Sequence, residues 1–90
     1  MKIKILNSAN LDLIDGYWFY EKQAKELGAY FLDTLFSDID SLKIYAGVHS
    51  IHFEKYYRLL SKRFPFAVYY CIEDDAVLIY AVLDCRRNPA

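Results

Sequence analysis

The spacing of apolar residues changes once along this chain, near Gly47, and that change limits the folds open to it. From Ala9 to about Tyr45, apolar residues recur every three or four positions, which is the spacing of helices. After Val48 the apolar residues are β-branched or aromatic and lie in short runs separated by turn residues, which is typical of strands. A short alternating segment, Lys2 to Leu6, precedes the helices and predicts one more strand. The resulting order, β-α-α-β-β-β, predicts an α+β fold.

Two helices are predicted in the first half of the chain. The first runs from Ala9 to about Lys25 and ends at Gly28, a left-handed residue after the last turn; the second runs from Ala29 to about Tyr45 and ends at Gly47. The first helix has a wide apolar arc and must be covered on more than one side; the arc comprises Leu11, Leu13, Ile14, Tyr17, Trp18, Tyr20, Ala24 and Leu27. The second has one apolar stripe, made of Leu32, Leu35, Phe36, Ile39, Leu42 and Ala46. Two helices joined by a short glycine turn form an antiparallel hairpin.

The second half of the chain predicts the remaining strands. They span Tyr56 to Lys62, Ala67 to Glu73 and Ala76 to Leu83, with a short edge strand at Ser50 to Phe53. Short turns between consecutive strands predict antiparallel pairing. The last run is almost wholly apolar, so it should be covered on both faces or meet a partner. We therefore expect a single domain, residues 1–90, with an antiparallel sheet and the helical hairpin packed on one face.

The composition excludes several classes of protein. Hydrophobic residues make up 56% of the 90 residues, which excludes intrinsic disorder. The net charge of −1 lacks the basic excess of a dedicated nucleic-acid binder. No apolar run approaches the ~20 residues that span a bilayer, and the first residues lack a signal-peptide pattern, so a cytoplasmic location without membrane contact is expected. Cys71 and Cys85 fit free thiols in a reducing compartment.

No cofactor or metal is expected from the sequence. The two histidines, His49 and His52, lie on an extended segment and do not converge on one metal without a third ligand.

Several segments, in order along nearly the whole chain, resemble the RelE/ParE superfamily of toxins. The resemblance lies in WFYEKQAKELGAYFLDTL at residues 18–35, in YRLL at 57–60, in KRFPF at 62–66, in VYY at 68–70, and in residues 77–89, which end in AVLDCRRNP. These segments are more similar to the ParE branch than to the RelE branch.

That resemblance implies the toxin of a type II toxin–antitoxin pair. Its partner would be a cognate antitoxin whose disordered segment folds on the toxin, giving a possible hetero-oligomer. RelE-like members cut messenger RNA in the ribosomal A site, whereas ParE-like members poison DNA gyrase. The prediction is therefore a ParE-like inhibitor of DNA gyrase that acts by protein–protein binding, with no covalent chemistry of its own. Two alternatives stay open: a RelE-like ribosome-dependent mRNA endoribonuclease, and a non-toxic antitoxin-binding relative.

The same resemblance suggests which cations face the target. Arg58 matches the family's strand arginine, and Arg86 or Arg87 matches its terminal arginine. The expected target-binding residues are Arg58, Lys62, Arg63, Arg86 and Arg87. In a metal-independent nuclease, the three arginines of this set would hold phosphate, because cations stabilise the charge on a pentavalent phosphate.

Other features argue against a nuclease. No residue stands out as a general base. Asp84 stands where the family often has histidine, and no C-terminal tyrosine matches that of the RNA-cutting members. Arg58 could instead form a surface ion pair with Asp84 or Glu54, and the two terminal arginines could simply be solvated.

The many aromatic residues indicate a binding surface, because tyrosine and tryptophan are enriched at binding hot spots. The expected antitoxin-binding residues are Trp18, Phe19, Tyr30, Tyr45, Tyr56 and Tyr57. All but Trp18 are expected to be exposed. Trp18 is expected to pack in or near the core, and a contact with the partner is the second interpretation. The antitoxin would bind as a helix across the hairpin or as a strand added to a sheet edge.

Overall fold

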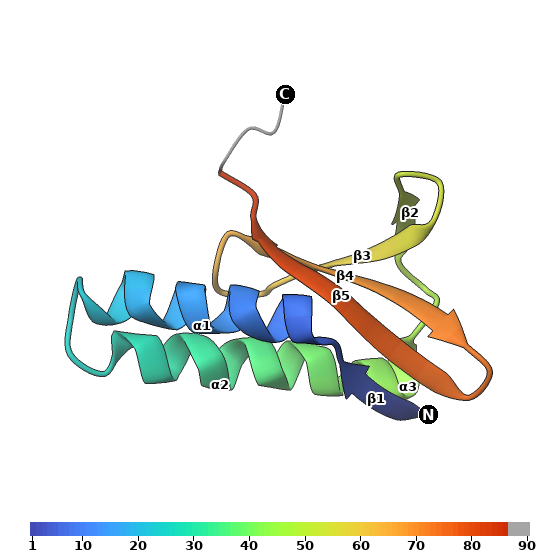
Figure 1. Ribbon diagram of the computed structural model, residues 1–90, viewed down its shortest axis with the longest axis horizontal. Helices are drawn as coiled ribbons and strands as arrows, with labels where there is room; N and C mark the ends of the chain where they lie inside the picture. The colour runs from blue at the N-terminus through green and yellow to red at the C-terminus, as the bar shows by residue number, and fades with distance from the viewer. Residues whose placement is uncertain (87–90) are drawn as a thin grey trace.

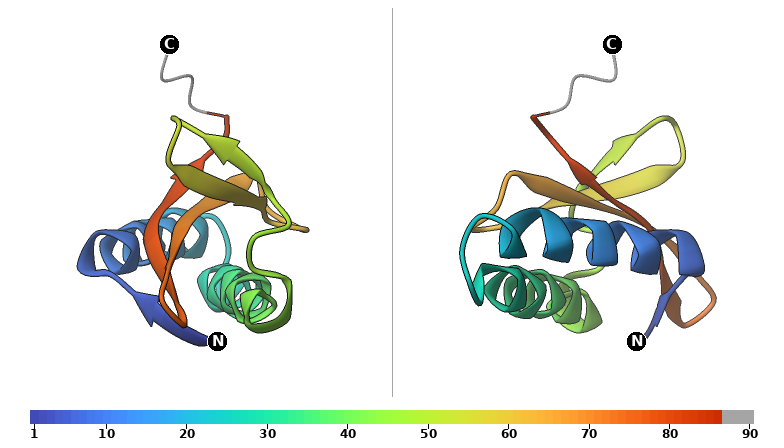
Figure 2. Two further views of the ribbon diagram at one scale, coloured as in Figure 1. Left: turned by 90° about the vertical axis from the view of Figure 1, so that its right-hand side faces the viewer. Right: turned by 60° about the vertical axis from the view of Figure 1, so that its left-hand side comes forward.

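The computed structural model, which describes residues 1–86, is a five-stranded sheet with its helices on one face (Figures 1 and 2). The elements are β1 (Lys2–Ile5), α1 (Asn7–Glu21), α2 (Leu27–Asp40), α3 (Leu42–Tyr45), β2 (Ser50–His52), β3 (Tyr56–Leu60), β4 (Phe66–Glu73) and β5 (Ala76–Asp84). The predicted α+β architecture with a helical hairpin is confirmed. Within residues 1–86, no helix has the length and apolar character to span a bilayer.

The strands follow the order β1-β5-β4-β3-β2, and the pairs among β2 to β5 are antiparallel as predicted. The prediction of a wholly antiparallel sheet is wrong at β1, which lies parallel to β5 with Lys2 opposite Ala76. Short turns dictate antiparallel pairing only between consecutive strands. The chain leaves β1 through the helices and returns to β5 much later, and such long connections permit parallel pairing. β5 lies between β1 and β4, which agrees with its nearly continuous apolar sequence.

The turn between the first two helices differs from the prediction. α1 ends at Glu21 rather than near Lys25, and Gly28 lies inside α2 instead of ending α1. Gly28 is needed for close packing, because a Cβ there would lie 2.6 Å from the carbonyl oxygen of Tyr17. The left-handed residue is Glu26, with φ 70°. The Glu21 carboxylate accepts hydrogen bonds from the backbone N–H groups of Glu26 (3.1 Å) and Gly28 (2.9 Å), which satisfies free donors at the start of α2.

The predicted second helix is divided at Ser41 into α2 and α3, and Gly47 follows α3 with φ 94°, in the left-handed region. Its buried face also differs from the prediction. Phe36 is 42% exposed, whereas Phe31, absent from the predicted stripe, is fully buried. Phe31 packs with Tyr20, Phe64 and Phe66 in a cluster of rings with centroids about 5 Å apart. This cluster fills the core between the hairpin and one end of the sheet.

A bulge in β5 is fixed by side chains from α1. Tyr69 pairs with Ala81 and Tyr70 with Ile79, so Tyr80 has no counterpart on β4. The Ser8 hydroxyl donates to the Tyr80 carbonyl (2.7 Å), and the Val82 N–H donates to the Asp12 carboxylate (2.9 Å). α1 therefore satisfies backbone groups near the bulge and is held in register with the sheet.

Tyr70 fastens the segment after α3 to the core. Its side chain is fully buried, and its phenol oxygen accepts a hydrogen bond from the Gly47 N–H (3.0 Å). The same phenol contacts His49 Nδ1, which accepts a hydrogen bond from the phenol in the neutral tautomer that carries its proton on Nε2. Burial lowers the pKa of His49. The neutral form of His49 is therefore the one that suits the folded state.

Stability is expected to fall as the pH is lowered through the ordinary pKa of histidine, near 6.5. Unfolded His49 takes up a proton there, while folded His49, with its lowered pKa, resists it. The unfolded state then binds more protons, and acid favours it. Urea unfolding at pH 7.5, 6.5 and 5.5 measures the effect, and His49→Gln should lose part of the slope seen in the wild type. Parallel pH profiles for the two proteins would rule out His49 as the source.

Candidate target-binding and partner-binding surfaces

Four of the five residues predicted to bind the target lie within the described residues, and they occupy three different places on the structure. Arg58 lines a pocket with residues of β2, β4 and β5; Lys62 and Arg63 line a hollow with α2; Arg86 contacts side chains of α1. Arg87 lies outside the described residues. Within residues 1–86, the expected cations therefore do not gather into one patch.

Arg86 is held by neighbouring side chains. Its guanidinium binds the Asp84 carboxylate through Nη2 (2.8 Å) and Nε (3.1 Å), lies 3.5 Å from the Tyr20 hydroxyl and stacks over the Phe19 ring. The predicted ion pair of Arg58 with Asp84 or Glu54 is wrong, since the ion pairs of the described residues do not include Arg58. Arg86 is two residues from Asp84, and a guanidinium at that distance can bind the carboxylate through the two nitrogens of one edge.

Lys62 and Arg63 are exposed in the turn between β3 and β4. The hollow that they line has a volume of about 460 Å³ and includes Tyr30 and Asp38. The turn is attached to α2 by a hydrogen bond from the Ser61 hydroxyl to the buried Asp38 carboxylate (2.7 Å). A target contacting these two cations would therefore also meet α2.

Arg58 lines the best-defined pocket on the face of the sheet that the helices do not cover. It lies in the middle of β3, opposite Ser50 of β2 and Tyr69 of β4. Its Nε is buried and has no hydrogen-bond partner among the described residues. The pocket has a volume of about 360 Å³ and is lined by His52, Phe53, Arg58, Tyr69, Leu83, Asp84 and Cys85. His52 in this pocket was considered from the sequence only as a metal ligand, because its spacing from Arg58 gives no sign that the two residues share a pocket.

An aromatic hollow of about 250 Å³ adjoins this pocket. It is lined by Phe53, Tyr56, Tyr69, Tyr80, Ala81 and Leu83, three of which also line the Arg58 pocket. Lys55 Nζ lies 5.4 Å from the centre of the Tyr56 ring and 5.9 Å from that of Tyr80. The hollow therefore combines aromatic walls with a cation at its rim.

Two of the aromatic residues expected to be exposed are half-buried instead. Tyr57 stacks on Tyr70 against the core, with ring centroids 5.2 Å apart. Tyr56 packs edge-on to Tyr80 across the sheet. Neighbouring residues of a strand point to opposite faces, so one ring is covered by the core and the other by neighbouring strands. The prediction of exposure is confirmed for the other three residues, Phe19, Tyr30 and Tyr45.

α1 carries an exposed apolar stripe, defined by Leu11, Ile14 and Trp18. These side chains are 53%, 44% and 55% exposed, and they recur at helical spacing. The expectation that α1 is covered on more than one side is wrong for this stripe, as is core packing for Trp18. The core takes the adjacent stripe, with Leu13, Gly16 and Tyr20. An exposed apolar helix face of this kind is typical of a binding surface.

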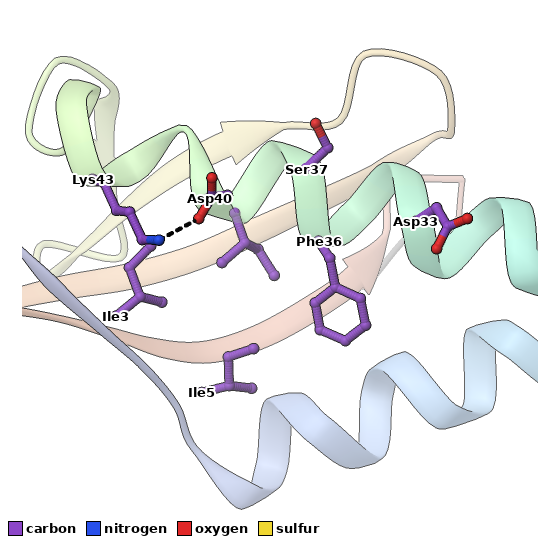
Figure 3. Close-up of a pocket in the computed structure, with 8 residues that line it drawn as sticks. Ile3, Ile5, Asp33, Phe36, Ser37, Asp40 and Lys43 are labelled. Atoms are coloured by element: carbon purple, nitrogen blue, oxygen red, sulfur yellow. Dashed lines mark ion pairs between the residues drawn. The ribbon is translucent and has the colours of Figure 1, made fainter.

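A groove of about 670 Å³ lies between β1 and α2 (Figure 3). Its apolar lining comes from Ile3, Ile5, Phe36 and Ile39, and its polar lining from Asp33, Ser37, Asp40 and Lys43. Lys43 pairs with Asp40 (2.8 Å) across the end of α2. β1 is an edge strand, so one row of its backbone groups is open to pairing. None of these residues was predicted as a partner contact. The sequence feature that could have indicated this groove is the alternation of lysine and isoleucine in β1, in which the lysines are exposed and the isoleucines are partly buried.

No protein-family model matches the sequence, and no curated protein is significantly similar to it. Among solved structures, a chain of the chromosomal ParDE TA system from P. aeruginosa is similar, with a TM-score of 0.83 and 17% sequence identity. The alignment covers 91% of this chain and 92% of that one. At this level of identity the similarity establishes the fold. This chain therefore has the fold of a protein from a ParDE TA system, in agreement with the RelE/ParE-like architecture expected from the sequence.

Proposed function

We propose that this protein is the toxin of a type II toxin–antitoxin system, of the ParE type, which inhibits DNA gyrase by protein–protein binding and is neutralised by a cognate antitoxin. The observation that carries the proposal is the fold shared with the ParDE chain over 91% of the residues. Because one fold can host several activities, the choice of target rests on the site.

The arrangement of cations favours a protein target over phosphate chemistry. Cleavage of RNA needs several cations around one phosphate. Among residues 1–86, Arg86 is bound to Asp84, and Lys62 and Arg63 line a hollow different from that of Arg58. A net charge of −1 also suits a protein target better than bare nucleic acid.

The antitoxin is expected to cover the α1 stripe and the groove between β1 and α2. Both are apolar and open to solvent, and a disordered segment can bury such surfaces as it folds. A helix fits the stripe, and a strand paired with β1 fits the groove. The toxin and its antitoxin would form a hetero-oligomer in the cytoplasm.

The alternative is a RelE-like ribosome-dependent endoribonuclease. One observation favours it: His52 lines the same pocket as Arg58, so a possible general base and a phosphate-binding cation lie close together. Arg58→Ala would then abolish message cleavage while the antitoxin still binds. A third possibility, a non-toxic relative, predicts antitoxin binding without growth arrest.

Pulse labelling in a bacterial host separates these functions. Expression is induced, and DNA and protein synthesis are followed over the first minutes. We expect DNA synthesis to fall first, together with a DNA-damage response, because a poisoned gyrase leaves broken DNA. A first fall in protein synthesis with messages cut within codons would instead identify a nuclease. Unchanged growth with soluble protein present would identify the non-toxic relative.

A further inference from the structure

The guanidinium of Arg58 has an unused hydrogen-bond donor on the uncovered face of the sheet. Its Nε is buried and has no partner within residues 1–86, although neighbouring strands enclose the side chain. No ion pair among residues 1–86 includes Arg58, so its guanidinium lines a pocket of about 360 Å³ without a described counter-ion. A ligand in the pocket that offers an acceptor to the terminal nitrogens gains free energy from the contact.

The Arg58 pocket and the aromatic hollow beside it form one site, with Arg58 at one end and aromatic walls with Lys55 at their rim at the other. Phe53, Tyr69 and Leu83 line both, so a ligand in one compartment touches the wall of the other. Phe53 is held against Tyr69, with ring centroids 5.8 Å apart, by a loop in which both Phe53 (φ 56°) and Glu54 (φ 62°) are left-handed. Two consecutive non-glycine residues in that region are strained, and such strain is concentrated at binding sites.

From this arrangement we propose that the site binds a protein segment that carries a carboxylate beside an apolar side chain. The carboxylate would accept hydrogen bonds from the terminal nitrogens of Arg58, and the apolar group would fill the hollow between Phe53 and Tyr80. The inference rests on the proposed function, binding of a protein target, and it states which chemical groups of that target Arg58 would contact.

The local charges favour a carboxylate over a nucleic-acid strand. One guanidinium without a described counter-ion matches one carboxylate in charge and geometry. The Asp84 carboxylate lines the pocket, but its described ion pair is with Arg86 and not with Arg58. A bound nucleic acid would place successive phosphates along the face and need a row of cations. Among the described cations, Lys62 and Arg63 line a hollow with α2 instead, and Lys55 at the rim of the aromatic hollow is one further cation and not a row.

The test uses 3-phenylpropionate as a probe, because it joins a carboxylate to an aromatic ring through a short chain. Binding is followed by NMR, through the Nε–H signal of Arg58 and the backbone signals of Phe53 and Tyr69. We expect saturable shifts at these positions. The neutral amide, 3-phenylpropanamide, should bind about tenfold more weakly or worse, because it cannot form a charge-assisted pair. Arg58→Gln should lose affinity for the acid to a similar degree, while Lys25→Gln, a control at an exposed cation in the turn between α1 and α2, should keep it.

Three results would overturn the proposal. Equal binding of acid and amide would mean that the hollow selects only apolar groups. Unchanged affinity in Arg58→Gln, with a folded spectrum, would place the carboxylate elsewhere. Tighter binding of phenyl phosphate than of the acid would identify a phosphate site and favour nucleic acid. Because the titration needs neither gyrase nor toxicity, its failure and that of the pulse-labelling experiment are distinguishable.

Discussion

Phe31→Ala is expected to lower the free energy of unfolding by about 3–5 kcal/mol, the usual cost of deleting a buried phenylalanine ring. Phe31 is fully buried and packs against Tyr20, Phe64 and Phe66, so its loss opens a cavity between the hairpin and the sheet. Urea unfolding measures the change. Phe36→Ala is the matched control on the same helix, and with 42% of Phe36 exposed it should cost much less. Equal losses in the two variants would contradict this account of the core.

A double-mutant cycle with Gly16 tests the same contact from the other helix. A Cβ on Gly16 would lie 2.5 Å from the Phe31 ring, so Gly16→Ala should destabilise the wild type by about 1–3 kcal/mol through overpacking. In a Phe31→Leu background the ring is gone. The substitution should then be far less harmful or even stabilising, since alanine favours helix over glycine by about 1 kcal/mol. Additive effects of the two substitutions would show that Gly16 and Phe31 are not coupled.

The case of Gly16 shows where sequence patterns stop being informative for this fold. Helix propensity treats Gly16 as a small weakness and Gly28 as a helix end. Both glycines instead allow α1 and α2 to approach closely, at Phe31 and at Tyr17. The hairpin itself was predictable, because the spacing of apolar residues is local information. The close approach was not, since it depends on which turns of the two helices meet.

In the sheet, too, local features were predictable from the sequence, whereas the contact between distant segments was not. Alternation, β-branched residues and the Asp74-Asp75 turn predicted β2 to β5 and their antiparallel pairing. The position of β1 beside β5 was not predictable from turn length, because more than 60 residues separate the two strands. Strand order along a chain does not determine neighbours in a sheet when a connection contains helices.

For the site, the sequence predicted residue types better than their surroundings. Arg58 was singled out, and it lines a pocket while its buried Nε has no hydrogen-bond partner among residues 1–86. The alternative ion pair of Arg58 with Asp84 is not formed, and an arginine two residues along the chain binds Asp84. On α1, two adjacent stripes are both apolar, so composition alone could not decide which one faces the core. The structure buries Tyr20 and exposes Trp18.

Trp18→Ala is expected to weaken antitoxin binding by about 2–4 kcal/mol, or about 30-fold to 1,000-fold in Kd, which is the range of a tryptophan hot spot. Trp18 lies at one end of the α1 stripe, 55% exposed, and its ring packs edge-on with the ring of Tyr17. Because the ring is outside the core, the free energy of unfolding of the isolated protein should change by less than about 0.5 kcal/mol. Calorimetric titration with the proposed antitoxin gives the affinity. Ile44→Ala, which removes an 80% exposed side chain outside the stripe, is the matched control.

The alternative binding mode is a strand paired with β1 at the groove, and it predicts different effects of the same kind of substitution. If the antitoxin adds a strand to β1 rather than laying a helix on α1, Phe36→Ala should weaken binding strongly and Trp18→Ala should not, because Phe36 lines the groove and Trp18 does not. Loss of affinity in both variants would mean that one disordered segment covers both surfaces, with a helix on the stripe and a strand at the edge. If neither variant loses affinity, the antitoxin does not use the exposed apolar faces of the hairpin. The proposed neutralisation would then have to act through the uncovered face of the sheet, where Arg58 lies.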